Sequence, residues 1–157
     1  MQICVASDNQ AIAEELRYLS DYLNEGIIVE TGPVSGCCDV LLLHDLPNSP
    51  APTAGTVVLN SDESGLTDLL NDVNPQLLIT YGFNSKASIT ASSVCEGTCC
   101  ICVQRAFTTT TGVHRDQQEF TVMTRDPGVT LAAVSALLAA DMDTAGIQTL
   151  GMLVPRA

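Results

Sequence analysis

The chain has 157 residues and a net charge of −12 at pH 7, with 46% hydrophobic and 15% charged residues. This length and hydrophobicity are typical of one globular domain with a buried core, and they exclude a disordered chain. Nucleic acids and anionic membranes require a positively charged surface, so a chain with only six Lys and Arg excludes both as partners.

The first half of the chain alternates short apolar segments with amphipathic ones. The apolar segments predict five strands, at residues 2–6, 27–30, 39–44, 56–60 and 76–82. After the first strand, a capping box at Ser7–Gln10 begins a helix, and Gly26 ends it. Large apolar residues recur along this helix at helical spacing, at Ile12, Leu16, Leu19 and Leu23.

A second helix is expected before Pro75, with Ser61 or Asp62 as its N-cap. Its apolar stripe consists of Leu66, Leu69, Leu70 and Val73. Unbroken apolar strands separated by helices predict a mainly parallel sheet with helices on both faces.

The pattern changes after Lys86. Partly alternating segments rich in β-branched residues predict a small three-stranded antiparallel sheet, at residues 87–94, 99–107 and 119–124. Asp126 and Pro127 then open a helix that is apolar nearly all round and therefore buried. Residues 146–154 could add a last short strand.

We therefore expect a single α/β domain over residues 1–157. Residues 1–86 would form its parallel part, and residues 87–157 the antiparallel meander and the closing helix. The segment LLITYGFNSKA (77–87) would join the two sheets as a hinge, with Leu77 to Ile79 buried, Tyr81 at the surface and Lys86 in solvent.

The sequence also bears on the cellular location. No apolar run is long enough to span a bilayer, and the first ten residues lack the basic segment and apolar run of a secretory signal. We expect a cytoplasmic protein, in which thiols stay reduced. Seven Cys, an odd number, also fit free thiols better than a closed set of disulfides.

Three motifs occur in the order found in one enzyme family. They are Asn60, Asp62 and Glu63 after one strand; Thr80, Tyr81 and Gly82 after the next; and Leu131, Ala132 and Ala133 in the late helix. In these motifs the chain resembles the central domain of the Mur ligases, ATP-dependent enzymes that add amino acids to peptidoglycan precursors. The resemblance implies the α/β fold described above, and it is the only basis for considering ATP or magnesium as cofactors.

The same comparison indicates that the ligase chemistry is missing. Where the family has a Gly-Lys-Thr phosphate loop, this chain has Gln10, Ala11 and Ile12. His44, followed by Asp45, replaces a magnesium-binding Glu. The segment that carries further metal and substrate groups is reduced to the connector 47–55, a His-Asn pair becomes Arg125 and Asp126, and the family's two flanking domains have no counterpart.

Asn60, Asp62 and Tyr81 lie where the family holds the adenosine part of ATP, so they are the candidate residues of a residual nucleotide site. The alternative is structural: Asp62 caps a helix and Asn60 closes a turn. No catalytic residue and no metal site are expected. Small buried thiols account best for Cys37, Cys38, Cys95 and the CCIC segment at 99–102, although a Cys37–His44 pair would offer a reactive thiol.

Three functions remain open. The first is a non-catalytic Mur-ligase-like domain that acts through protein contacts or self-association, since lost flanking domains would expose apolar surface. The second is an adenine-nucleotide-binding module without hydrolysis, or a remnant of a peptidoglycan-precursor ligase. The third is an enzyme of unrelated chemistry that uses Cys and His.

Overall fold

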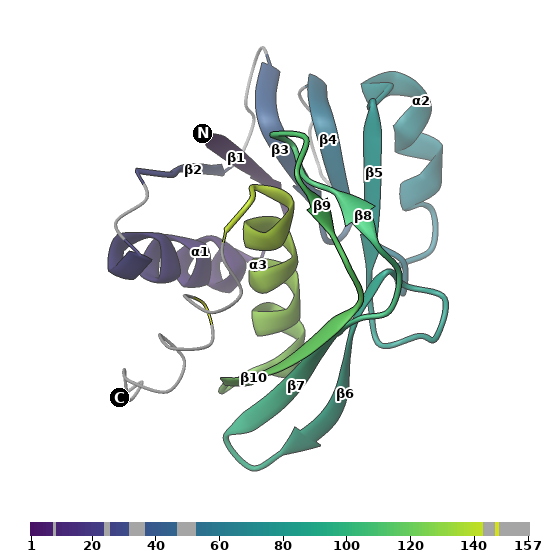
Figure 1. Ribbon diagram of the computed structural model, residues 1–157. Coiled ribbons are helices and arrows are strands. Elements are labelled where there is room, and N and C mark those ends of the chain that lie inside the picture. Colours follow the sequence, from purple (N-terminus) through teal and green to yellow (C-terminus); the bar gives the residue numbers. More distant parts are fainter. Residues whose placement is uncertain (8, 24–25, 32–36, 47–52, 143–146, 148–157) are drawn as a thin grey trace.

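The computed structural model describes residues 1–7, 9–23, 26–31, 37–46, 53–142 and 147. Eight of its strands form one sheet, in the order β10-β7-β6-β5-β4-β3-β1-β2 (Figure 1). In chain order these are β1 (Gln2–Ala6), β2 (Ile28–Thr31), β3 (Cys37–Leu43), β4 (Thr53–Asn60), β5 (Leu77–Tyr81), β6 (Ile89–Cys95), β7 (Thr98–Val103) and β10 (Gln118–Met123). The helices are α1 (Gln10–Leu23), η1 (Leu66–Leu69), α2 (Leu70–Val73) and α3 (Pro127–Ala139).

The mainly parallel α/β class predicted from the sequence is confirmed. In the order of the sheet, neighbouring strands from β2 through β1, β3, β4 and β5 to β6 pair in parallel. The pairs β6–β7 and β7–β10 are antiparallel. The predicted separate three-stranded sheet is wrong in one respect. Tyr81 on β5 pairs with Ile89 on β6, so the antiparallel strands continue the main sheet. The separate small sheet has two strands, β8 (Phe107–Thr108) and β9 (His114–Arg115).

One face of the sheet is covered by α1 and α3, which contact each other (Figure 1). Three residues of the predicted stripe of α1, Ile12, Leu16 and Leu19, are buried here, and so is every residue of α3 from Val129 to Ala139. Because α3 is apolar nearly all round, it fits only where the sheet, α1 and the hairpin surround it. This face holds the larger of the two apolar clusters.

The opposite face has a smaller apolar cluster, formed by β1, β3 and β4 with Leu66 and Val73 above them. Helices therefore lie on both faces, as predicted. On this face of β5, however, Leu78 is 46% exposed. The expectation that Leu77 to Ile79 are all buried is wrong. Ile79 is buried in the cluster with α3, whereas Leu78 points to the opposite face, because alternate residues of a strand face opposite ways. Leu77 shares the face of Ile79 but is only partly buried at the beginning of the strand.

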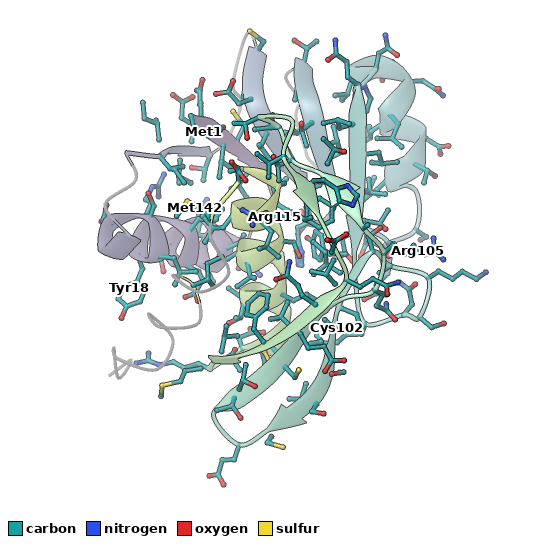
Figure 2. All side chains as sticks on the ribbon, in the orientation of Figure 1. Met1, Tyr18, Cys102, Arg105, Arg115 and Met142 are labelled. Atoms are coloured by element: carbon teal, nitrogen blue, oxygen red, sulfur yellow. The ribbon has the colours of Figure 1, made fainter. Side chains whose placement is uncertain are left out.

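The β8–β9 hairpin holds the carboxyl end of α3. The Thr110 N–H donates to the carbonyl of Ala139 at 2.8 Å, and the Arg115 guanidinium bonds Asp141 at 2.9 Å and the Met142 carbonyl at 3.0 Å. Arg115 and Met142 lie together in Figure 2. This hairpin thus fixes the end of the buried helix.

Helix caps agree only in part with the sequence prediction. Asp126 caps α3 as predicted, since its Oδ1 accepts the N–H groups of Gly128 and Val129. At the beginning of α1, the Ala11 N–H donates to the side chain of Asn9. The residue that caps this helix is therefore Asn9 and not the predicted Ser7. Before η1 the cap position is Gly65, without a side-chain bond, so neither Ser61 nor Asp62 caps this helix.

The strand expected at 146–154 lies, apart from Ile147, outside the described residues. Within the described part of the chain, no helix combines the length and apolar character that crossing a membrane requires.

Candidate functional site: the carboxyl edge of the parallel strands

The parallel strands β1, β3, β4 and β5 end along one edge of the sheet, and each is followed by polar residues. In open α/β sheets, ligands bind outside the carboxyl ends of the strands. We call the polar side chains that meet here the carboxyl-edge network: Ser7, His44, Asp45, Asn60, Ser61, Asp62, Tyr81 and Asn84.

Asn60 and Asp62 hold the loop that follows β4. The Asn60 Oδ1 accepts the N–H of Asp62 at 3.0 Å, and its Nδ2 donates to the His44 carbonyl at 2.9 Å. Asn60 therefore closes a turn, as the structural alternative predicted. It also ties the end of β4 to the end of β3.

The Asp62 carboxylate reaches across to the segment that follows β5. Its Oδ2 accepts the N–H of Phe83 at 2.7 Å, and its Oδ1 accepts Asn84 Nδ2 at 2.7 Å. Gly82 lies directly beneath it, since a Cβ at Gly82 would be 2.8 Å from the carboxylate. Asp62 thus joins two loops and caps no helix.

Tyr81 is buried, with 2% of its surface exposed, which corrects the expectation of a surface position. Its hydroxyl lies 2.7 Å from His44 Nδ1, and the two rings are stacked. Burial raises the pKa of Tyr81 strongly, and the negative charges of Asp45 and Asp62 add to this effect. The phenol therefore stays neutral and serves as a hydrogen-bonding group in the core.

The beginning of α1 lies beside this network. Ser7 Oγ donates to Asp45 Oδ2 at 3.1 Å and accepts the Asn9 N–H at 2.9 Å. The Ala11 N–H donates to Asn9 Oδ1 at 3.0 Å, and Ile12 is buried in the core. Those two residues thus take part in capping and packing.

The three candidate residues from the sequence, Asn60, Asp62 and Tyr81, do lie in one network. Asn84 holds its own turn, since its Oδ1 accepts the Lys86 N–H. Sequence reasoning missed its bonds to Ser61 and Asp62. It also missed the Ser7–Asp45 pair, which spans 38 residues of sequence. The available signal was a polar residue directly after each apolar strand.

Cys37 and His44 do not form a catalytic pair. Cys37 begins β3 and His44 follows its last residue, so they are roughly 20 Å apart at about 3.3 Å per residue. Only Cys4, Cys38 and Cys99 are buried, whereas Cys37 and Cys95 are exposed and Cys100 and Cys102 are intermediate. The prediction that the cysteines are small buried thiols is therefore correct for only three of the seven. Among the described residues no three metal-ligating side chains converge on one point.

Comparisons of the whole chain with known proteins give a likeness of fold. No family profile and no curated protein sequence matches. Two crystal structures of MurF from Acinetobacter baumannii match with TM-scores of 0.61 and 0.60, each at 8% identity. A UDP-N-acetylmuramoylalanyl-D-glutamyl-2,6-diaminopimelate--D-alanyl-D-alanyl ligase from the same organism matches with a TM-score of 0.59 at 7% identity.

These alignments cover 99% of this chain but only 45%, 46% and 46% of the three solved chains. The chain therefore spans less than half the length of these structures. At this level of identity the likeness concerns the fold alone. The chain has a Mur-ligase-like fold.

Proposed function

We propose that this domain is a cytoplasmic, non-catalytic Mur-ligase-like module, a pseudoenzyme that acts through protein contacts, in the first instance with a second copy of itself. The observation that carries this proposal is the exposure of Leu46 and Phe83, each 52% exposed, beside the carboxyl-edge network. Large apolar side chains exposed beside a polar network favour a protein partner.

The arrangement of the carboxyl edge supports a non-catalytic role. Phosphoryl transfer depends on cations and backbone amides that neutralise and cradle the phosphates. Here the aligned positions are Ala11 and Ile12, and the Ala11 amide donates to Asn9. Asp62 accepts two protein hydrogen bonds, so a magnesium ion would have to compete with both donors.

The two exposed apolar residues flank the same loop. Leu46 lies against Gly65, 3.8 Å from the position of a Cβ there, and the Phe83 backbone is bonded to Asp62. The loop of residues 61–65 therefore has one apolar side chain at each end. Because each copy has a net charge of −12, a second copy is repelled at low salt and approaches more readily when salt screens the charge.

Sedimentation velocity at increasing protein concentration tests self-association. We expect dimers that strengthen between roughly 0.1 and 1 M salt, as the Debye length falls from about 10 to about 3 Å. Leu46→Ser and Phe83→Ser should weaken the dimer, whereas Val94→Ser, a similarly exposed residue on β6, should not. A chain that stays monomeric at both salt concentrations, or a dimer equally sensitive to Val94→Ser, would refute this proposal.

The alternative is an adenine-nucleotide-binding module without hydrolysis. It is favoured by the position of Asn60, Asp62 and Tyr81 at the carboxyl edge, where such sheets bind ligands. Because Tyr81 is buried, the exposed ring of Phe83 is the aromatic surface that a base could reach. This alternative would make the domain a sensor or a remnant of a peptidoglycan-precursor ligase.

Calorimetry with ATP, ADP and adenosine, with and without magnesium, separates the two functions. The protein-contact proposal predicts no saturable heat of binding. The nucleotide alternative predicts micromolar binding that Phe83→Ser weakens while the melting temperature stays unchanged. Val94→Ser again serves as the control.

A further inference from the structure

Two cysteines share the face of β7 that points away from α3. On this strand Cys99, Ile101 and Val103 are buried, whereas Cys100 and Cys102 are partly exposed. Since alternate residues of a strand point to opposite faces, Cys100 and Cys102 point to the same face, where their thiols lie side by side. Cys102 is labelled in Figure 2.

The pairing of β7 with β10 gives the neighbours of this thiol pair. On β10, Thr121 lies opposite Cys100 and Glu119 lies opposite Cys102. The Cys102 thiol contacts the Glu119 carboxylate at 3.6 Å, and Glu119 itself is exposed. The pair is thus open to solvent on an acidic protein, where a cation can reach it.

We propose that Cys100 and Cys102 together bind a soft monovalent cation, of which Cu(I) is the representative, as a two-coordinate dithiolate. Thiolates select Cu(I) over harder ions. Structural zinc sites need four ligands, and no group of three metal-ligating side chains occurs within the described residues. A pair of thiols without a third ligand therefore favours an ion that binds stably to only two ligands.

The spacing suits this coordination. Residues i and i+2 of a strand are about 6.6 Å apart along the chain. Two metal–sulfur bonds as long as a zinc–sulfur bond, about 2.3 Å, would span roughly 4.6 Å, which the two thiols could reach by leaning toward each other. A disulfide would require the two Cβ atoms at roughly 3.5–4.5 Å and hence a distorted strand. Each thiol releases its proton to water as its sulfur–copper bond forms, and copper keeps its oxidation state.

Competition of the reduced protein with a coloured Cu(I) chelator, without oxygen, tests the proposal. We expect one Cu(I) per chain, and a loss of affinity of more than about 100-fold in Cys100→Ser and in Cys102→Ser, since outer-shell partners alone are worth about 10- to 100-fold. Cys37→Ser and Cys95→Ser, which change exposed thiols elsewhere, should bind as the parent chain does.

A further variant, Cys38→Ser, separates this site from the buried pair of Cys4 and Cys38, which lie in one apolar cluster. The proposal predicts unchanged binding in this variant. Failure to take up Cu(I), or uptake lost in Cys38→Ser but retained in Cys100→Ser and Cys102→Ser, would overturn it. Circular dichroism on each variant verifies that the fold is kept, and none of these measurements depends on self-association.

Discussion

The contact between Gly82 and Asp62 makes a sharp prediction about stability. A Cβ at Gly82 would lie 2.8 Å from Cγ and Oδ1 of Asp62 and 2.9 Å from Oδ2. Such distances are shorter than van der Waals contact, so Gly82→Ala must push the carboxylate away. The carboxylate would then lose its bonds to the Phe83 N–H and to Asn84 Nδ2.

The magnitude follows from these two bonds. Hydrogen bonds to a charged group are worth about 1.5–3 kcal/mol each, and solvent around the exposed Asp62 places them at or below the lower end. We expect Gly82→Ala to lower the free energy of unfolding by about 2–3 kcal/mol. Asp62→Ala alone should lower it by about 2 kcal/mol, because the same bonds are lost.

The double variant tests the reasoning. Asp62→Ala removes all three atoms that a Cβ at Gly82 would meet. Adding Gly82→Ala to it should therefore cost less than it does in the parent chain, by a coupling free energy of roughly 2 kcal/mol. The cost that remains is the strain of a side chain at the φ of +159° of Gly82. Urea unfolding of the four proteins, compared at equal m-values, measures this coupling. If the losses in the free energy of unfolding caused by the two substitutions simply add, the contact with Asp62 is not what excludes a side chain at residue 82.

Three other outcomes are expected. Because burial raises the pKa of Tyr81 above its ordinary value of 10.0, the unfolded chain ionises first, and stability should fall as the pH rises above about 10. The fall should be smaller in Tyr81→Phe, as measured by urea midpoints across this pH range, and an identical fall would contradict the role of Tyr81. Arg115→Met should destabilise by about 1–2 kcal/mol, between the values of exposed and buried ion pairs, because it breaks the bond to Asp141 in the hairpin that holds α3. Thermal unfolding measures this loss, with Arg105→Met, an exposed residue, as the control. Asp126→Ala should cost about 1 kcal/mol by removing the N-cap of α3, whereas Asp126→Asn should retain most of the stability, which urea unfolding can distinguish.

The sequence by itself determined the local elements of this protein. Apolar segments of strand length and helical spacing place β1, β3, β4, β5 and α1 close to their observed positions. The cap of α3 is also a local signal, since Asp126 bonds residues only two and three positions away. In each case the interacting groups are close in sequence, so their pattern is visible without the fold.

Only the tertiary structure decided which face each strand residue takes. Period-two alternation indicates that Leu78 and Ile79 point opposite ways, but not which of them α3 covers. The same holds for β7, where Cys99 is buried and Cys100 and Cys102 are partly exposed. The face is chosen by where distant helices pack, and that choice depends on the area buried by the whole chain.

The candidate site depends on the fold in the same way. Asp45 reaches Ser7, Tyr81 reaches His44, and Asp62 reaches Asn84 only because the parallel strands all end at one edge of the sheet. Each of these pairs spans more than 20 residues, so no local pattern links its members. The strand order brings them together, and it is determined by the packing of the two apolar faces, because buried area, summed over many residues, outweighs any single polar contact.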